Sequence, residues 1–188
     1  EQQKLSLSDS ISKHISDLPD QWRSITIKQL LSHTSGLPDI EDQNEDKLVG
    51  SGGLNSAWVT VQKMPMQFEA GMDFNYNATN YLLIQKVIEK YSQVSFEESI
   101  KANQFDVAGM KQAFYANSFD VQENKSPTYV YYYIDEVTRE MVKGDNLIET
   151  HEEFPTSFRA DAGVFTTAND MAKWIIALQN GQLLQKNS

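Results

Sequence analysis

The sequence predicts a helix-rich fold with one β-hairpin, forming a single folded unit over residues 1–188. Apolar residues recur at helical spacing in several segments, whereas residues 126–142 alternate as strands do. The chain is 40% hydrophobic and 11% aromatic, which is enough apolar material for 188 residues to bury a core.

The N-terminal part is predicted to hold short helices separated by loops. Ser8 or Asp9 can cap a short helix that follows the end of a strand and stops before Pro19. Residues 41–53 carry acids and glycines with little apolar periodicity. They predict a loop or a short helical excursion.

A second helix is predicted to begin after Thr26. Thr26 is its expected N-cap, and Ile27, Leu30 and Leu31 are expected to share its apolar face. Gly36 is the expected stop, because glycine adopts the left-handed conformation that ends many helices.

Three more helices are predicted in the middle of the chain. Asn55 to Lys63 forms the first, and Ala78 to Tyr91 forms the longest, which is apolar enough to be central and buried. Ser95 and Glu98 have the spacing of a capping box, so they predict another helix directly after it.

The C-terminal part is predicted to hold a hairpin and a last helix. Aromatic and β-branched residues alternate from Tyr129 to Ile134, with a turn near residues 136–139. Thr167 is the expected cap of a helix that ends at Gly181. Its inward face is predicted to consist of Met171, Trp174, Ile175 and Leu178.

Composition excludes several kinds of partner and chemistry. With 16 basic and 26 acidic residues, the net charge of −10 opposes nucleic acid and anionic membrane surfaces. The absence of cysteine excludes disulfides and cysteine nucleophiles. No apolar run has the length that a membrane-spanning helix needs.

Three segments carry a family resemblance. They are LLSHTSGLPD at Leu30 to Asp39, FNYNATNYLLIQKVIEK at Phe74 to Lys90, and AGVFTTANDMAKWIIALQNGQLL at Ala162 to Leu184. In this order and spacing they resemble the β-lactamase-related serine hydrolases, which include class C β-lactamases, penicillin-binding proteins, D-alanyl-D-alanine peptidases and esterases.

The resemblance implies that residues 1–188 are the helical lobe of the β-lactamase/transpeptidase-like α+β fold, with both flanks of the α/β lobe missing. The family's Ser-x-x-Lys nucleophile helix and Lys-Thr-Gly strand lie in those flanks. Tyr76 matches the family tyrosine, which shuttles a proton. Without nucleophile and oxyanion donors this chain is expected to be inactive, while the longer parent hydrolyses β-lactams, D-alanyl peptides or esters through an acyl-enzyme.

One position departs from the family pattern. The family asparagine two residues after the tyrosine falls on Ala78, which cannot hydrogen-bond a substrate amide. Asn80, one helical turn from Tyr76, or Asn77 is the expected substitute in substrate binding. The parent is accordingly expected to favour esters or other small substrates over β-lactams.

Other candidate residues are interpreted as structural. Ser10 and Lys13 have Ser-x-x-Lys spacing but lie on a polar helix face. His33 is expected to support a helix end as scaffold. His14, His33 and His151 show no metal-ligand spacing, so no metal or other cofactor is expected.

A second class of function is a non-catalytic interaction module that uses the hairpin from Tyr129 to Ile134. Its tyrosines could stack on a sugar or peptide, or alternation could simply bury one face of the hairpin. The expected partners are the missing α/β lobe of the same polypeptide, a small-molecule or peptidoglycan-like substrate, and a second copy, because uncovered apolar surface favours dimers. Family analogy suggests a periplasmic or membrane-anchored parent.

Overall fold

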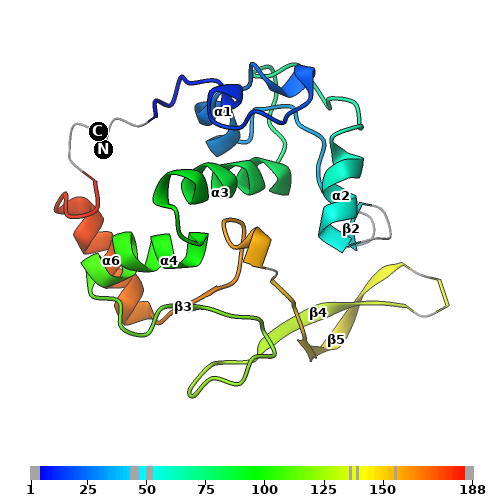
Figure 1. Cartoon of the computed structure of the whole chain (residues 1–188). Helices are drawn as coiled ribbons and strands as arrows, with labels where there is room; N and C mark the ends of the chain where they lie inside the picture. The colour runs from blue at the N-terminus through cyan, green and yellow to red at the C-terminus, as the bar shows by residue number, and fades with distance from the viewer. Residues whose placement is uncertain are drawn as a thin grey trace.

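The computed structural model describes residues 5–42, 47–49, 53–135, 137–138, 140–154 and 156–184. Within them, helices and three two-stranded antiparallel sheets form an α+β fold around the long helix α3 (Figure 1). The helices are η1 (Ile11–Lys13), η2 (Asp20–Trp22), α1 (Ile27–Leu31), α2 (Gly53–Val61), α3 (Ala78–Ser92), α4 (Phe96–Ile100), η3 (Lys101–Phe105), α5 (Asp106–Ala108), η4 (Thr156–Phe158) and α6 (Ala168–Gln179). The sheets pair β1 (Glu41–Asp42) with β2 (Lys47–Leu48), β3 (Phe114–Tyr115) with β6 (Val164–Phe165), and β4 (Thr128–Ile134) with β5 (Met141–Thr150).

The main hydrophobic core lies between α3 and the N-terminal segment. Trp22, Leu30 and Leu83 are fully buried in it. The rings of Trp22 and Trp58 meet edge to face with centroids 5.8 Å apart, which joins α2 to the same core. This packing fixes the position of α3 relative to α1, and with it the loop that precedes α3.

The first segment is less regular than predicted. A single 3-10 turn, η1, replaces the predicted helix, and Ser10 caps no backbone group with its side chain. The predicted strand end is reduced to one isolated antiparallel bridge between Ser10 and Thr26. The segment is held by burial of Ile11 and by the backbone bond from the Ile11 N–H to Ile25 O, at 2.7 Å.

Helix α1 begins as predicted and ends early. Thr26 caps it in a capping box with Gln29. The predicted stop at Gly36 is wrong, because the chain already turns at His33, which has a φ of 54°. Leu31, predicted to lie on the buried face, is 41% exposed.

Gly36 does not end a helix as predicted but allows a close approach between two backbone segments. Its φ is +71°, and a Cβ placed on it would lie 2.1 Å from the Phe68 carbonyl oxygen. Only glycine allows the two backbones to approach so closely in this conformation. The constraint is tertiary and could not be recognised from the helical pattern alone.

The middle helices follow the prediction. Helix α2 covers most of the predicted range, α3 extends from Ala78 to Ser92, and the Ser95–Glu98 capping box is formed at α4. Residues 43–46 and 50–52 of the predicted loop lie outside the described residues.

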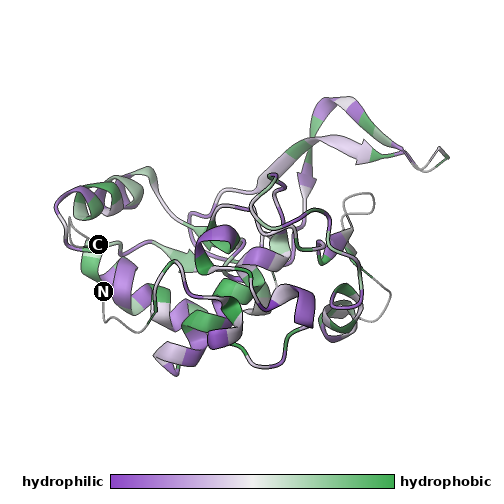
Figure 2. Ribbon diagram, turned by 90° about the horizontal axis from the view of Figure 1, so that it is seen from above, coloured by the Kyte–Doolittle hydropathy of each residue, from purple (hydrophilic) through white to green (hydrophobic). Residues whose placement is uncertain are grey.

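The hairpin formed by β4 and β5 projects away from the body of the molecule (Figures 1 and 2). The predicted alternation is present, but it does not bury one face. Tyr129, Tyr131, Tyr132 and Tyr133 are each between 43% and 52% exposed, so both faces are accessible. The register shifts between Val130 and Tyr132, which marks a bulge in the ladder.

Helix α6 has the predicted cap and an unexpected orientation. The Thr167 side chain accepts a hydrogen bond from the Asp170 N–H. Its buried residues are Asp170 and Ala177, whereas Met171 is 42%, Ile175 45% and Leu178 37% exposed. The predicted inward face is therefore only partly buried. In the described part of the chain, no helix combines the length and the apolar character needed to cross a bilayer.

Candidate functional site

The candidate site is centred on Tyr76, in the loop that leads into α3. Its side chain is 62% exposed, and its ring stacks on His33 with centroids 4.5 Å apart and an interplanar angle of 29°. A phenol held by one face in this way has an oriented ring while most of the residue stays accessible.

His33 forms the support on which Tyr76 rests. Its other stacking partner is Tyr81, at 5.0 Å and 21°, and the imidazole is only 8% exposed. The Asn77 backbone N–H donates to Nδ1 over 3.2 Å, so Nδ1 is the acceptor nitrogen and the proton lies on Nε2. Burial lowers the pKa of His33, which favours this neutral form. The arrangement agrees with the scaffold role predicted for His33.

The two asparagines predicted to bind substrate lie inside the protein. Asn77 is 1% exposed and donates from Nδ2 to Leu37 O over 2.7 Å. Asn80 is 0% exposed, accepts from Ser35 Oγ over 2.5 Å and bonds His33 Nδ1 over 3.2 Å. Both amides fasten residues 33–37 to the start of α3, and this buried position argues against the substrate contact predicted for them.

The same junction extends along the loop after Gly36. Thr79 Oγ1 donates to Pro38 O over 2.8 Å and accepts from the Ile40 N–H over 2.9 Å. The Ala78 N–H donates to Asp39 Oδ1 over 3.2 Å, and Ala78 itself is 2% exposed. The position that the resemblance assigns to the family asparagine is thus occupied by a buried alanine whose backbone is part of the junction.

A group of carboxylates near Tyr76 was absent from the predicted site. Burial raises the pKa of Asp161, and the nearby Asp39 charge raises it further. The Asp161 charge is in turn the largest cause that raises the pKa of Tyr76, followed by burial. Asp39 and Asp161 lie in or beside the segments that carry the family resemblance, but an isolated aspartate there has no pattern that distinguishes it from a surface residue.

The remaining candidates have structural partners. Lys13 Nζ bonds Asp9 Oδ1 at 2.7 Å, and Ser10 Oγ lies 3.2 Å from Ser12 Oγ, so Ser10 and Lys13 do not form a nucleophile and base pair. His14 is 1% exposed and its Nδ1 lies 2.8 Å from the Tyr91 hydroxyl. Within the described ranges, no three His, Asp or Glu side chains gather as metal ligands would.

An exposed tyrosine before a central helix, resting on a His-Thr-Ser-Gly loop in an α+β fold, is the arrangement expected from the resemblance to β-lactamase-type and penicillin-binding-protein-type serine hydrolases. The family model described as Beta-lactamase matches residues 1–188, and the chain belongs to this family.

Similar proteins agree with this assignment. The chain is 26% identical to penicillin-binding protein 4* of Bacillus subtilis (strain 168), over 98% of its own length and 42% of that protein. A penicillin-binding protein from Bacillus halodurans has 25% identity and a TM-score of 0.67, with coverage of 97% of this chain and 55% of the other. A D-amino acid amidase from Ochrobactrum anthropi SV3 shares the fold at 22% identity, with a TM-score of 0.75 over 97% of this chain and 52% of the amidase. The chain therefore spans less than half of this curated penicillin-binding protein.

Proposed function

We propose that this chain is the helix-rich lobe of a serine hydrolase that works through an acyl-enzyme, with Tyr76 as its proton-transfer residue. The observation that carries the proposal is the orientation of Tyr76, whose ring is stacked on His33 while its side chain stays 62% exposed. A general acid or base needs both a fixed position and access to the reacting group.

The charges near Tyr76 determine whether its phenol is protonated in this chain. The negative charge of Asp161 raises the pKa of the phenol, so Tyr76 holds its proton at neutral pH. A cation is needed to stabilise the phenolate, and the lysine of the family's Ser-x-x-Lys motif would supply it from a part of the polypeptide outside residues 1–188. Tyr76 would then relay the proton between the serine hydroxyl and the leaving group.

The same proposal makes the isolated chain inactive. Acylation needs a serine with an adjacent base and donors aimed at the oxyanion. Ser10 lies beside Ser12 and Lys13 is paired with Asp9, so this pair offers no such nucleophile. The α/β lobe of the same polypeptide is the partner that would complete the cleft.

Substrate preference follows from Ala78. Ala78, which is 2% exposed, offers no side-chain donor to a substrate amide, and Asn77 Nδ2 and Asn80 Oδ1 are engaged in hydrogen bonds of the buried junction. We therefore favour esters or other small substrates over β-lactams for the complete enzyme, with a peptidoglycan-like substrate as the larger alternative. A periplasmic or membrane-anchored location belongs to the same proposal.

A labelling experiment tests this function. A fluorescent penicillin and an activated ester are incubated with the 188-residue chain and with a longer polypeptide that also carries a Ser-x-x-Lys motif and the C-terminal strands. Covalent label on the longer form alone, with faster reaction of the ester, supports the proposal. An adduct on the 188-residue chain, or no adduct on either form, contradicts it.

The hairpin supports one alternative, a binding module without catalysis. Both of its faces expose tyrosines, and Ile134 and Met141 are 51% and 60% exposed. Aromatic faces of this kind stack on sugars or peptides. Replacing Tyr131 and Tyr132 by serine would abolish binding of peptidoglycan fragments in this alternative and leave acylation of the longer form unchanged.

A further inference from the structure

Residues 156–162 lie between the hairpin and α6 and form a tight turn, the η4 turn, that packs against α3. Phe158 is 6% exposed and belongs to the main core. Its carbonyl oxygen accepts from the Asp161 N–H over 3.0 Å and from the Ala162 N–H over 3.3 Å. The backbone of Asp161 is therefore anchored to the core that contains α3.

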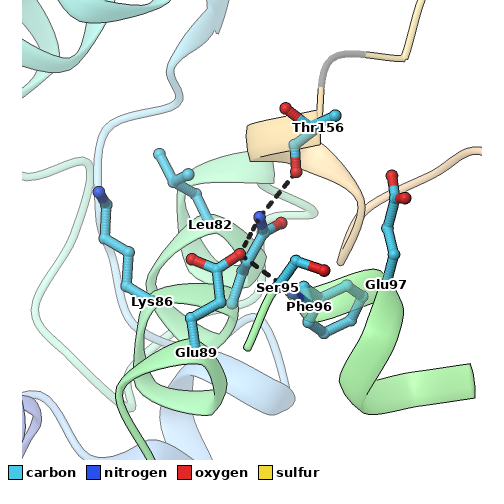
Figure 3. A pocket seen from close by; sticks show the side chains of 8 residues that line it. Leu82, Lys86, Glu89, Ser95, Phe96, Glu97 and Thr156 are labelled. Carbon is cyan, nitrogen blue, oxygen red and sulfur yellow. Dashed lines mark hydrogen bonds between the residues drawn. The ribbon is translucent and has the colours of Figure 1, made fainter. Parts of the chain in front are cut away.

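One buried side chain of α3 bonds both halves of the η4 turn. Gln85 is 2% exposed, its Nε2 donates to Thr156 O over 2.9 Å, and its Oε1 accepts from the Ala160 N–H over 3.1 Å. Figure 3 shows the bond to Thr156 as a dashed line. Nε2 also donates to Glu89 Oε1 over 3.0 Å, which fixes the rotation of the amide. A carboxylate accepts without donating and an ammonium group donates without accepting, so neither could replace this carboxamide.

The η4 turn has a second attachment that does not involve α3. Arg159 is 7% exposed, its Nε lies 2.6 Å from Glu97 Oε1, and its Nη1 donates to Ala116 O over 2.8 Å. These contacts join the turn to α4 and to the residue that follows β3. Without the amide of Gln85, the turn would therefore stay attached to the protein but could shift relative to α3.

Asp161, in the second half of this turn, acts electrostatically on both rings of the Tyr76 site. Its charge is the largest cause that raises the pKa of Tyr76. It is also the largest charge effect on His33, whose pKa is lowered by burial and raised by Asp161. Asp39 also acts on both rings and Glu41 on Tyr76, and both lie outside the η4 turn. Since the interaction between charges weakens with distance, the effect of Asp161 depends on where the turn holds it.

We propose that Gln85 is a positioning residue for Tyr76. Its amide holds the η4 turn against α3, and the turn holds the Asp161 carboxyl group near the stacked rings. Gln85 would thereby control how firmly the phenol keeps its proton, without touching a substrate. The catalytic meaning of this control rests on the proposed function, whereas the link from Gln85 to Tyr76 is a property of the 188-residue chain itself.

NMR titration of Tyr76 and His33 in the 188-residue chain tests the proposal. Gln85→Met keeps the length of the side chain and removes both the donor and the acceptor. We expect the pKa of Tyr76 and that of His33 both to fall, by no more than in Asp161→Asn, because the Asp161 charge raises both. In the double variant, Gln85→Met should add nothing to Asp161→Asn, since the charge that it displaces is already gone.

The directions of the two shifts separate displacement of Asp161 from general loosening. Burial lowers the pKa of His33, so exposing the stacked rings would raise the pKa of His33 toward 6.5 while that of Tyr76 falls. Opposite shifts of the two groups would overturn the proposal. Unchanged values, or a Gln85→Met effect that persists in the Asp161→Asn background, would overturn it as well.

Gln62→Met is the matched control, because Gln62 Nε2 donates to Trp58 O over 3.0 Å at the end of α2, and its loss should change neither pKa. Where Gln85→Met does not fold, two measurements still decide. Asp161→Asn alone must lower both pKa values, and the Ala160 amide of the unsubstituted chain must exchange slowly with solvent. Failure of either would refute the proposal. Absence of acylation in the longer polypeptide would instead refute the proposed function and leave these titrations unaffected.

Discussion

Tyr76 and His33 show how ring stacking orients a single exposed phenol. The imidazole lies between Tyr76 and Tyr81, with centroid distances of 4.5 Å and 5.0 Å. Its Nδ1 accepts from the backbone of Asn77, which fixes the plane of the ring. The stack therefore transmits the rigidity of the α1–α3 junction to Tyr76.

Asp161→Asn should lower the pKa of Tyr76 toward the ordinary value for tyrosine, because the Asp161 charge is the largest cause that raises it. The pKa is measured by NMR titration of ¹³C-tyrosine-labelled protein, with Tyr76→Phe to assign the signal. Asp145→Asn removes an equal charge on the hairpin and should change nothing. An unaltered titration in Asp161→Asn would show that Asp161 does not act on this phenol.

His33 should make the fold sensitive to acid. Its pKa is lowered from 6.5 in the folded state, so the unfolded chain binds the proton more tightly. The free energy of unfolding contributed by His33 is complete above about pH 6.5 and declines as the pH falls toward the folded-state pKa.

Urea unfolding at pH 7.5 and 5.5 measures this effect. The loss of unfolding free energy between the two values should be smaller in His33→Gln than in the unsubstituted chain, because glutamine does not titrate. Asp161, whose pKa burial raises, contributes the opposite trend at lower pH, so the difference between the two proteins is the decisive quantity. Identical pH dependence in both proteins would show that His33 is not the titrating group.

At the scale of the elements, two glycines with the same backbone conformation differ in how closely other atoms approach them. Gly36→Ala should lower the free energy of unfolding by at least about 3 kcal/mol, since it combines left-handed strain with a clash against the Phe68 carbonyl. Gly109 also has a φ of +71°, but a Cβ added there would meet no atom within 4 Å, so Gly109→Ala should cost only about 1 kcal/mol. Urea denaturation of both variants measures the difference, and equal losses would refute the close approach at Gly36.

Local signals predicted the starts of α1, α4 and α6. Thr26, Ser95 and Thr167 each cap a helix as expected, because the hydrogen bonds of a cap involve residues only three positions apart. The place where α1 ends was predicted incorrectly. His33 takes the left-handed conformation there because of its stacking and hydrogen bonds with residues beyond position 74, which are 40 or more positions away in the sequence.

Periodicity also identified apolar faces without identifying what covers them. The pattern Met171, Ile175 and Leu178 was correctly recognised as one stripe of a helix, yet the structure leaves it partly exposed. Prediction of the candidate site from the sequence was limited in the same way. Tyr76 was found through a motif, whereas the buried junction of Asn77 and Asn80 and the field of Asp161 depend on contacts between distant segments.

At the scale of the whole molecule, the partly exposed apolar stripe on α6 is explained by the fact that the chain matches only part of the length of its relatives. The chain spans 42% of penicillin-binding protein 4* of Bacillus subtilis, and the stripe of Met171, Ile175 and Leu178 on α6 is only partly covered by the described residues. Contiguous apolar patches of this kind mark interfaces. In our proposal the α/β lobe covers the stripe in the complete enzyme.

Without that lobe, the 188-residue chain should associate with itself through α6. Sedimentation equilibrium should give a mass that rises above the 21.4 kDa of the monomer as concentration increases. Met171→Gln with Ile175→Gln should restore the monomer, and the cost in stability should stay within about 0.5 kcal/mol per site, because both side chains are already exposed. Val121→Gln, which removes an isolated residue that is 98% exposed, is the matched control and should leave association unchanged. A monomer at all concentrations would show that the stripe alone does not drive contact, and persistent association in the double variant would move the contact surface to the hairpin.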